Sequence, residues 1–186
     1  MAPPPKTPST PEATEKYYAK FHQYQGNTTH CADYSISMAC HVYYDKQGKS
    51  TKRCRVDKIT KFLDQYFFLG YRFPAREGIT EGGATPGGIM AALLLLQIPF
   101  FFNPFGTLSA VEHMLIDGKM VIVSQGQIMD PKSGTWGHVM LIVGMDGGVF
   151  LILDPANRQG GISRMDKRAF VNNWWYPPLH PYWVIG

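Results

Sequence analysis

A cysteine at the expected start of a helix is the residue best placed to do covalent chemistry. Behind Cys31, the apolar residues Ala32, Ile36, Ala39 and Tyr43 recur at helical spacing, which predicts a helix that begins near Cys31. Backbone N–H groups in the first turn of a helix lack intrahelical partners and carry the positive end of the helix dipole. Because both features stabilise a thiolate, Cys31 is the candidate nucleophile.

A nucleophilic thiol needs a base, and His138 is the best candidate of the six histidines. It follows a Gly-containing loop over 126–137 and begins an expected strand, and Gly137 before it leaves room for a close approach. Asp154, at the end of the next expected strand, could accept a hydrogen bond from the other ring nitrogen of His138. These residues therefore form a candidate Cys–His–Asp triad.

The register of the expected hairpin supports the pairing of His138 with Asp154. If 146–148 form a three-residue loop, Asp154 lies opposite Met140, on the same face of the sheet as His138 and diagonal to it. A two-residue loop would place Asp154 on the opposite face. The prediction is therefore conditional on the turn.

Further residues could stabilise the oxyanion or bind substrate. Gln25 lies on the segment that enters the first helix, where its amide could join the N–H of Cys31 in an oxyanion hole; Gln23 is a rival. His30 is interpreted as either a pocket residue or a helix cap, and Trp136 as either a cleft wall or a loop anchor. With Gly137, they are the candidate substrate-binding residues.

The elements that would position these residues follow an α+β order. Helices are expected at about 31–44, 56–68, 86–96, 109–117 and 166–175, with Thr28 and Thr29 as capping residues ahead of the first. Strands are expected at 98–102, where the apolar run predicts a buried strand, and at 120–124, 138–145 and 149–153. Helices followed by antiparallel strands favour an α+β fold over a βαβ repeat.

Composition limits the class of protein. The chain has 186 residues and 45% hydrophobic residues, which suits one domain over 16–186 behind a Pro-rich arm or linker over 1–15. The longest apolar run, 89–102, is too short and interrupted for a membrane span. A net charge of +4 without a binding motif argues against nucleic acid as a partner. The basic run over 46–61 is interpreted as a solvated face, with docking of an acidic protein as the alternative.

The cysteine count argues against two other classes. Three cysteines without a C-x-x-C pair exclude a disulfide framework and a thiolate zinc site, so no metal and no cofactor are expected. Cys40 is interpreted as a core residue and Cys54 as a loop thiol, and a reducing compartment is the default expectation.

The ordered set Gln25, Cys31, His138 and Asp154 resembles that of papain-like cysteine peptidases, in particular the C39 and C39-like group that includes double-glycine peptidases. The resemblance covers about residues 23–176 and includes GKMVIV, GHVMLIVG, VFLILDPA and an F-x-x-x-W helix. It implies a papain-like α+β fold, with a helical half carrying Cys31 and an antiparallel sheet half carrying His138 and Asp154. Family members usually have Asp-Cys-Gly at the nucleophile, where this chain has His-Cys-Ala.

The resemblance also implies a function. It suggests a cysteine protease that cleaves a protein substrate, with a Gly-Gly site as one option. A papain-like domain behind a Pro-rich arm is similar to toxin cargo of contact-dependent or type VI delivery systems, which is paired with an immunity protein. Such an effector, lacking a signal peptide, would act in the cytoplasm of a target cell. The alternatives are an NlpC/P60-like peptidoglycan amidase or endopeptidase, a glutamine deamidase, and a non-enzymatic binding module with a vestigial site.

Overall fold

A layer of helices on each side of one antiparallel sheet makes up the fold. The computed structural model describes residues 10–66, 69–72, 83–126, 137–174 and 180–186. The helices are α1 (Pro11–Ala19), α2 (Cys31–Lys46), α3 (Val56–Gln65), α4 (Pro86–Leu95), α5 (Leu108–Ile116) and α6 (Lys167–Asn173). The strands are β1 (Phe100–Asn103), β2 (Met120–Gln125), β3 (His138–Asp146), β4 (Val149–Leu153), β5 (Ser163–Asp166) and β6 (Tyr182–Ile185). The α+β class predicted from the sequence is confirmed.

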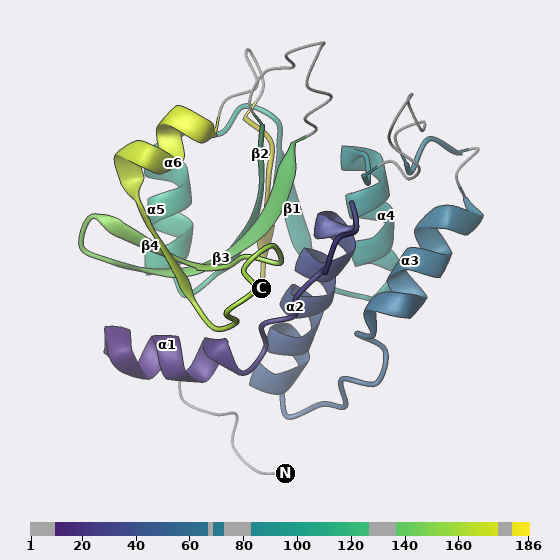
Figure 1. Cartoon of the computed structure of the whole chain (residues 1–186), viewed down its shortest axis with the longest axis horizontal. Helices are drawn as coiled ribbons and strands as arrows, with labels where there is room; N and C mark the ends of the chain where they lie inside the picture. Colours follow the sequence, from purple (N-terminus) through teal and green to yellow (C-terminus); the bar gives the residue numbers. More distant parts are fainter. Residues whose placement is uncertain (1–9, 67–68, 73–82, 127–136, 175–179) are drawn as a thin grey trace.

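Alternation along the strands explains why helices cover both faces of the sheet (Figure 1). Ile122, Leu141 and Leu153 pack in the core shared with α2, α3 and α4, whereas Val121 and Met140 face the core shared with α5 and α6. Because β2, β3, β4 and β6 are largely apolar on both faces, the centre of the sheet is buried between the two layers. The helical half and the sheet meet along α2, β2 and β3.

The order of strands in the sheet is β1-β6-β2-β3-β4-β5. The C-terminal strand β6 lies between β1 and β2, a position that its place in the sequence does not indicate. Consequently β1 is an edge strand: Phe101 is 61% exposed, and the expectation of a buried strand at this apolar run is wrong. Phe102 on the same strand instead stacks on the buried Trp183.

The β3–β4 hairpin has the predicted register near Asp154, but its turn differs from the predicted one. Asp146 pairs with Val149, so the turn has two residues rather than the expected three. The register then shifts at a β-bulge between Ile142 and Gly144, after which Leu141 pairs with Leu153. The extra residue in β3 offsets the shorter turn and returns the end of β4 to the face expected for Asp154.

The interpretation of Cys54 as a loop thiol is wrong. Cys40, in the middle of α2, and Cys54, in the loop before α3, form a disulfide with their Cα atoms 5.3 Å apart, and Cys31 remains a free thiol. An odd number of cysteines leaves room for one pair, and the 47–55 loop folds back along α2 to form it. The expectation of a reducing compartment, which followed from three unpaired thiols, therefore loses its basis.

α1 begins at Pro11, inside the range 1–15 that the sequence predicts to be an arm or linker; residues 1–9 lie outside the described ones. Thr10 caps this helix by accepting a hydrogen bond from the N–H of Ala13. Tyr17 on α1 donates to the carboxylate of Asp45 on α2 at 2.9 Å. Within the described ranges, no helix is long and apolar enough to cross a membrane.

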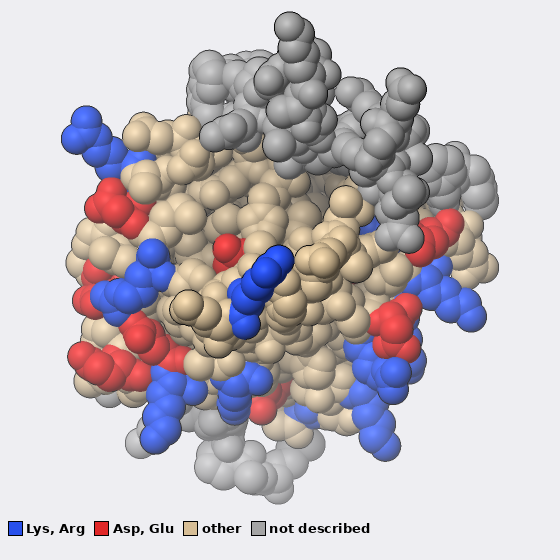
Figure 2. Space-filling model, viewed as in Figure 1, with Lys and Arg blue, Asp and Glu red and all other residues tan. Residues whose placement is uncertain are grey.

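The basic run over 46–61 does not form one unbroken patch. Arg55 pairs with Asp57, and Arg53 donates to the amide oxygen of Gln97 at 2.9 Å. The face of the molecule in Figure 2 shows Lys and Arg side chains interspersed with Asp and Glu. These pairings agree with the interpretation of the run as a solvated face.

Candidate active site

Cys31, His138 and Asp154 are brought together where α2 meets the sheet. Cys31 is the first residue of α2 and is 7% exposed, and its sulfur accepts a hydrogen bond from the backbone N–H of Val139 at 3.4 Å. His138, the first residue of β3, therefore lies directly beside the thiol. Asp154 follows the last residue of β4, and its Oδ1 lies 2.6 Å from Nε2 of His138.

The environment of His138 favours its protonated form. Burial alone would lower the pKa of the ring, but hydrogen bonds to Asp154 and Cys31 and the charges of both raise it to about 10. Since Asp154 occupies Nε2, the nitrogen available to Cys31 is Nδ1. The ring thus stands between a sulfur and a carboxylate, which is the arrangement of a Cys–His–Asp relay.

The carboxylate of Asp154 is fixed by its own turn. Oδ1 accepts a second hydrogen bond from the N–H of Ala156 at 2.8 Å, in the manner of an Asx turn. Burial would raise the pKa of Asp154, but the hydrogen bond and charge of His138 hold it below its ordinary value. Asp154 is therefore anionic at neutral pH, as an orienting acceptor must be.

Gln25 lies in the turn that leads into α2. Its amide nitrogen donates to the carbonyl of Thr28 at 2.7 Å, and the hydroxyl of Thr28 donates back to the carbonyl of Gln25 at 2.9 Å. These bonds fix the amide within the turn before Cys31. The rival Gln23 instead accepts from the hydroxyl of Ser37, on the second turn of α2.

His30 occupies the N-cap position of α2, but its ring makes no cap hydrogen bond. Nδ1 instead lies 3.0 Å from the Oδ2 of Asp33 in the first turn of α2. Neither Thr28 nor Thr29 is the N-cap residue, so the predicted cap is wrong. His30 therefore stands at the N-cap position without capping the helix through its side chain.

A buried ion pair anchors the first turn of α2, and the sequence analysis missed it. Asp33 is 0% exposed, and each of its oxygens accepts from the guanidinium of Arg72 at 2.7 Å. Arg72 also donates to Asp64 on α3, and Thr60 donates to Asp33. Burial would raise the pKa of Asp33, but hydrogen bonds from His30 and Arg72 and the charge of Arg72 lower it. Only the acidic residue in the first helical turn hinted at this role.

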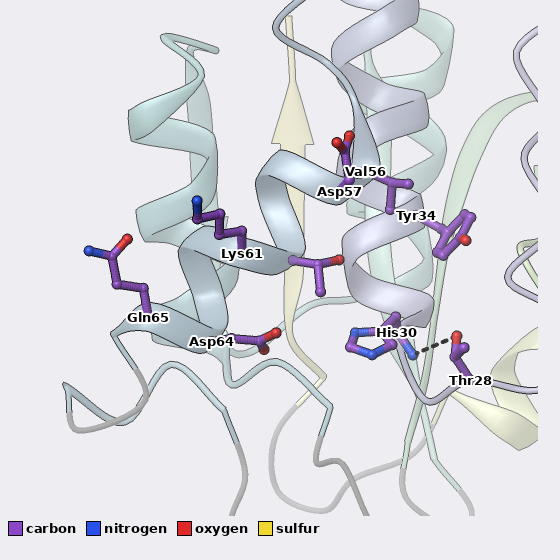
Figure 3. A pocket seen from close by; sticks show the side chains of 9 residues that line it. Thr28, His30, Tyr34, Val56, Asp57, Lys61, Asp64 and Gln65 are labelled. Carbon is purple, nitrogen blue, oxygen red and sulfur yellow. Dashed lines mark hydrogen bonds between the residues drawn. The ribbon is translucent and has the colours of Figure 1, made fainter.

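An open pocket of about 900 Å³ lies beside the start of α2 (Figure 3). Thr28, His30 and Tyr34 line it from the side of Cys31, and α3 contributes the facing wall, including Thr60, Lys61 and Gln65. Cys31, His138 and Asp154 are not among its lining residues, so the pocket lies next to the candidate triad only through His30, whose ring points into it (Figure 3). Its lining is rich in hydroxyl, amide and charged groups.

The other two predicted substrate-binding residues are Trp136 and Gly137. Trp136 lies outside the described residues. Gly137 precedes β3, and a Cβ atom there would come within 3.0 Å of the carbonyl oxygen of Gln125 and 3.1 Å of the hydroxyl of Ser124. The small residue thus allows a close approach of the backbone to β2, which fixes the position of His138.

Comparisons with known proteins identify the family. Residues 15–176 match the Peptidase_C39 like family, and since this is most of the chain, the protein belongs to that family. Its fold is similar to a Bacillus anthracis protein described as a C39-like peptidase, with 13% identity, a TM-score of 0.59, and coverage of 89% of this chain and 93% of the other.

A variant of the Salmonella effector SpvD also aligns, at 9% identity and a TM-score of 0.41, with coverage of 100% of this chain and 82% of the other. A search of curated proteins gives no match. The C39-like, papain-like fold predicted from the sequence is thereby confirmed, and the chain is a member of a peptidase family.

Proposed function

We propose that this protein is a cysteine peptidase in which Cys31 is the nucleophile, His138 the acid–base residue and Asp154 the orienting acceptor. The observation that carries the proposal is the position of His138, with Nε2 2.6 Å from the Asp154 carboxylate and its other nitrogen toward Cys31. Membership of a peptidase family supports the same reading.

The proposed reaction begins when the thiolate of Cys31 attacks the carbonyl carbon of a peptide bond. A C–S bond forms and the carbonyl oxygen becomes an oxyanion, which accepts from the N–H of Cys31 and the amide of Gln25. His138 gives its proton to the leaving amine as the C–N bond breaks. Water, deprotonated by His138, then attacks the acyl–enzyme, the C–S bond breaks and Cys31 is regenerated.

The proposed substrate is a protein. An open pocket beside the start of α2, lined in part by His30, is wide enough to support binding of a peptide chain next to the residue that precedes Cys31. The proposal of a delivered toxin that acts in a target cytoplasm and is held inactive by an immunity protein stands on the sequence resemblance. Its test is expression in a bacterial host: toxicity is expected for the wild type and not for Cys31→Ala.

The test of peptidase activity is a proteome-wide comparison of new N-termini. Wild type and Cys31→Ala are incubated with portions of the same bacterial lysate, so that Cys31→Ala is the matched control. New termini with the wild type alone support the proposal. A mass gain of about one unit on an uncut protein would indicate a glutamine deamidase, and release of peptidoglycan fragments an amidase or endopeptidase.

A further inference from the structure

His22 lies on the segment between α1 and α2 and contacts the backbone that carries Asp154. Its Nε2 is 2.8 Å from the carbonyl oxygen of Asp154. A carbonyl only accepts hydrogen bonds, so Nε2 must be the donor. The side chain is half-buried, and no sequence pattern indicates a partner for it.

Asp154 needs such support because it lies just beyond the last paired residue of β4. Pairing with β3 ends at Leu153, so no ladder hydrogen bond fixes the next peptide unit. The carbonyl of Asp154 accepts from the N–H of Asn157 at 3.0 Å and from His22. One donor comes from the turn itself, whereas His22 ties that turn to another part of the chain.

A second contact runs parallel to the first. The N–H of Gln25 donates to the carbonyl of Pro155 at 2.9 Å. Segment 22–25, which leads to the nucleophile, is therefore hydrogen-bonded twice to the segment 154–155, which carries the acceptor of the triad. The other ring nitrogen of His22 faces Gly160, where an added Cβ would be 3.8 Å away, so the ring fits against the 155–161 turn.

We propose that His22 is a positioning residue that holds Asp154 in hydrogen-bonding distance of His138 by donating to the Asp154 backbone carbonyl. This inference rests on the proposed cysteine peptidase function. His22 touches neither the reacting atoms nor Cys31. Its effect on the reaction passes through the Asp154 carboxylate, which in turn sets the proton affinity and orientation of the His138 ring.

The charge of a protonated His22 supports Asp154 in addition to the hydrogen bond between them. A protonated His22 lowers the pKa of Asp154, although more weakly than His138 does. The hydrogen bond itself persists when His22 is neutral, since Nε2 keeps its proton in the tautomer that the carbonyl requires. Position is therefore the main contribution of His22, and its charge a smaller one.

The test compares His22→Met, which removes the donor, with His22→Gln, whose amide nitrogen can reach the place of Nε2. In full-length protein, NMR titration measures the pKa of His138, and iodoacetamide alkylation followed by mass spectrometry measures the reactivity of Cys31. We expect His22→Met to lower the pKa of His138 by about one unit. It should also slow alkylation of Cys31 at pH 7 severalfold, because the His138 ring is held less well in the orientation that stabilises the thiolate. His22→Gln should restore both.

The matched control is His113→Met. The ring of His113 also contacts a backbone carbonyl, that of Ser109 at 2.7 Å, but on the exposed helix α5. Its variant should behave as the wild type in both assays. If His22→Met fails to fold, His22→Asn takes its place, because its shorter amide does not reach the Asp154 carbonyl.

Two results would overturn the inference: wild-type values for His22→Met, or equal defects in His22→Gln and His22→Met, which would show that packing rather than the hydrogen bond matters. Either result leaves the proposed function intact when His138→Gln still abolishes rapid alkylation of Cys31. If the cysteine peptidase proposal itself is wrong, the result is different: Cys31→Ala would yield the same new N-termini as the wild type.

Discussion

Replacing Arg72 with methionine should be among the most destabilising single changes in the protein. The substitution leaves the Asp33 carboxylate, which is 0% exposed, without the two 2.7 Å hydrogen bonds and the charge that compensate for its burial. The bond from Arg72 to Asp64 contributes less, since the Asp64 side chain is 55% exposed.

The size of the destabilisation depends on which partners Asp33 keeps in Arg72→Met. Hydrogen bonds to charged groups contribute about 1.5–3 kcal/mol each, and breaking a buried ion pair costs about 3–5 kcal/mol. Thr60 and His30 still contact Asp33, which places the loss of unfolding free energy near 4 kcal/mol. With a urea m-value of about 2 kcal/mol/M, the midpoint should fall by about 2 M.

Urea unfolding at pH 7, followed by circular dichroism, measures this change. The double variant Asp33→Leu, Arg72→Met should recover most of the loss, because an apolar pair leaves no buried charge. The folded-state pKa of Asp33 is lowered, so the pair contributes stability above the unfolded pKa of about 4 that is lost as pH falls. A loss below about 1 kcal/mol for Arg72→Met, with no recovery in the double variant, would refute this reasoning.

Four further predictions concern the candidate triad and the elements that position it. In Asp154→Asn, NMR titration should place the pKa of His138 well below its value of about 10, by about two units because the ring is 30% exposed; an unchanged pKa would contradict the pairing. Because that folded-state pKa is raised, the stability from His138 should be complete below about pH 6.5 and lost as pH rises through 10, and pH-dependent unfolding measures it. Reduction of Cys40–Cys54, or their replacement by serine, should cost about 3 kcal/mol in thermal or urea unfolding and leave Cys31 reactive. Gly137→Ala should lower the free energy of unfolding by about 1–2 kcal/mol and slow Cys31 alkylation, because the added methyl group displaces the start of β3. Wild-type stability and alkylation rate would contradict this prediction, since they would show that β2 accommodates the methyl group.

The positions of the candidate triad residues were predictable because each lies at the end of a well-patterned element. The apolar period behind Cys31 identified the helix, and the alternating runs after His138 and before Asp154 identified the two strands. The hairpin prediction reached the right face only because a β-bulge near Val143 offset the two-residue turn. No local pattern reveals such a bulge, since Gly144 alone does not determine the register.

Features formed by distant residues were not predictable. Nothing near Asp33 indicates that Arg72 pairs with it, because partners of buried charges come together only through the tertiary fold. The same holds for the disulfide of Cys40 with Cys54 and for the contact of His22 with Asp154. The central place of β6 likewise depends on the sheet topology rather than on its short apolar sequence.

The central claim is that His138 takes and returns the proton of Cys31, and the most direct measurement is the rate of Cys31 alkylation in wild type and in His138→Gln at pH 6. At this pH an isolated thiol, with an ordinary pKa of about 8.5, reacts slowly. The account predicts that the wild type reacts at least about tenfold faster than His138→Gln, in keeping with the size of acid–base effects. Equal rates in the two proteins would contradict it.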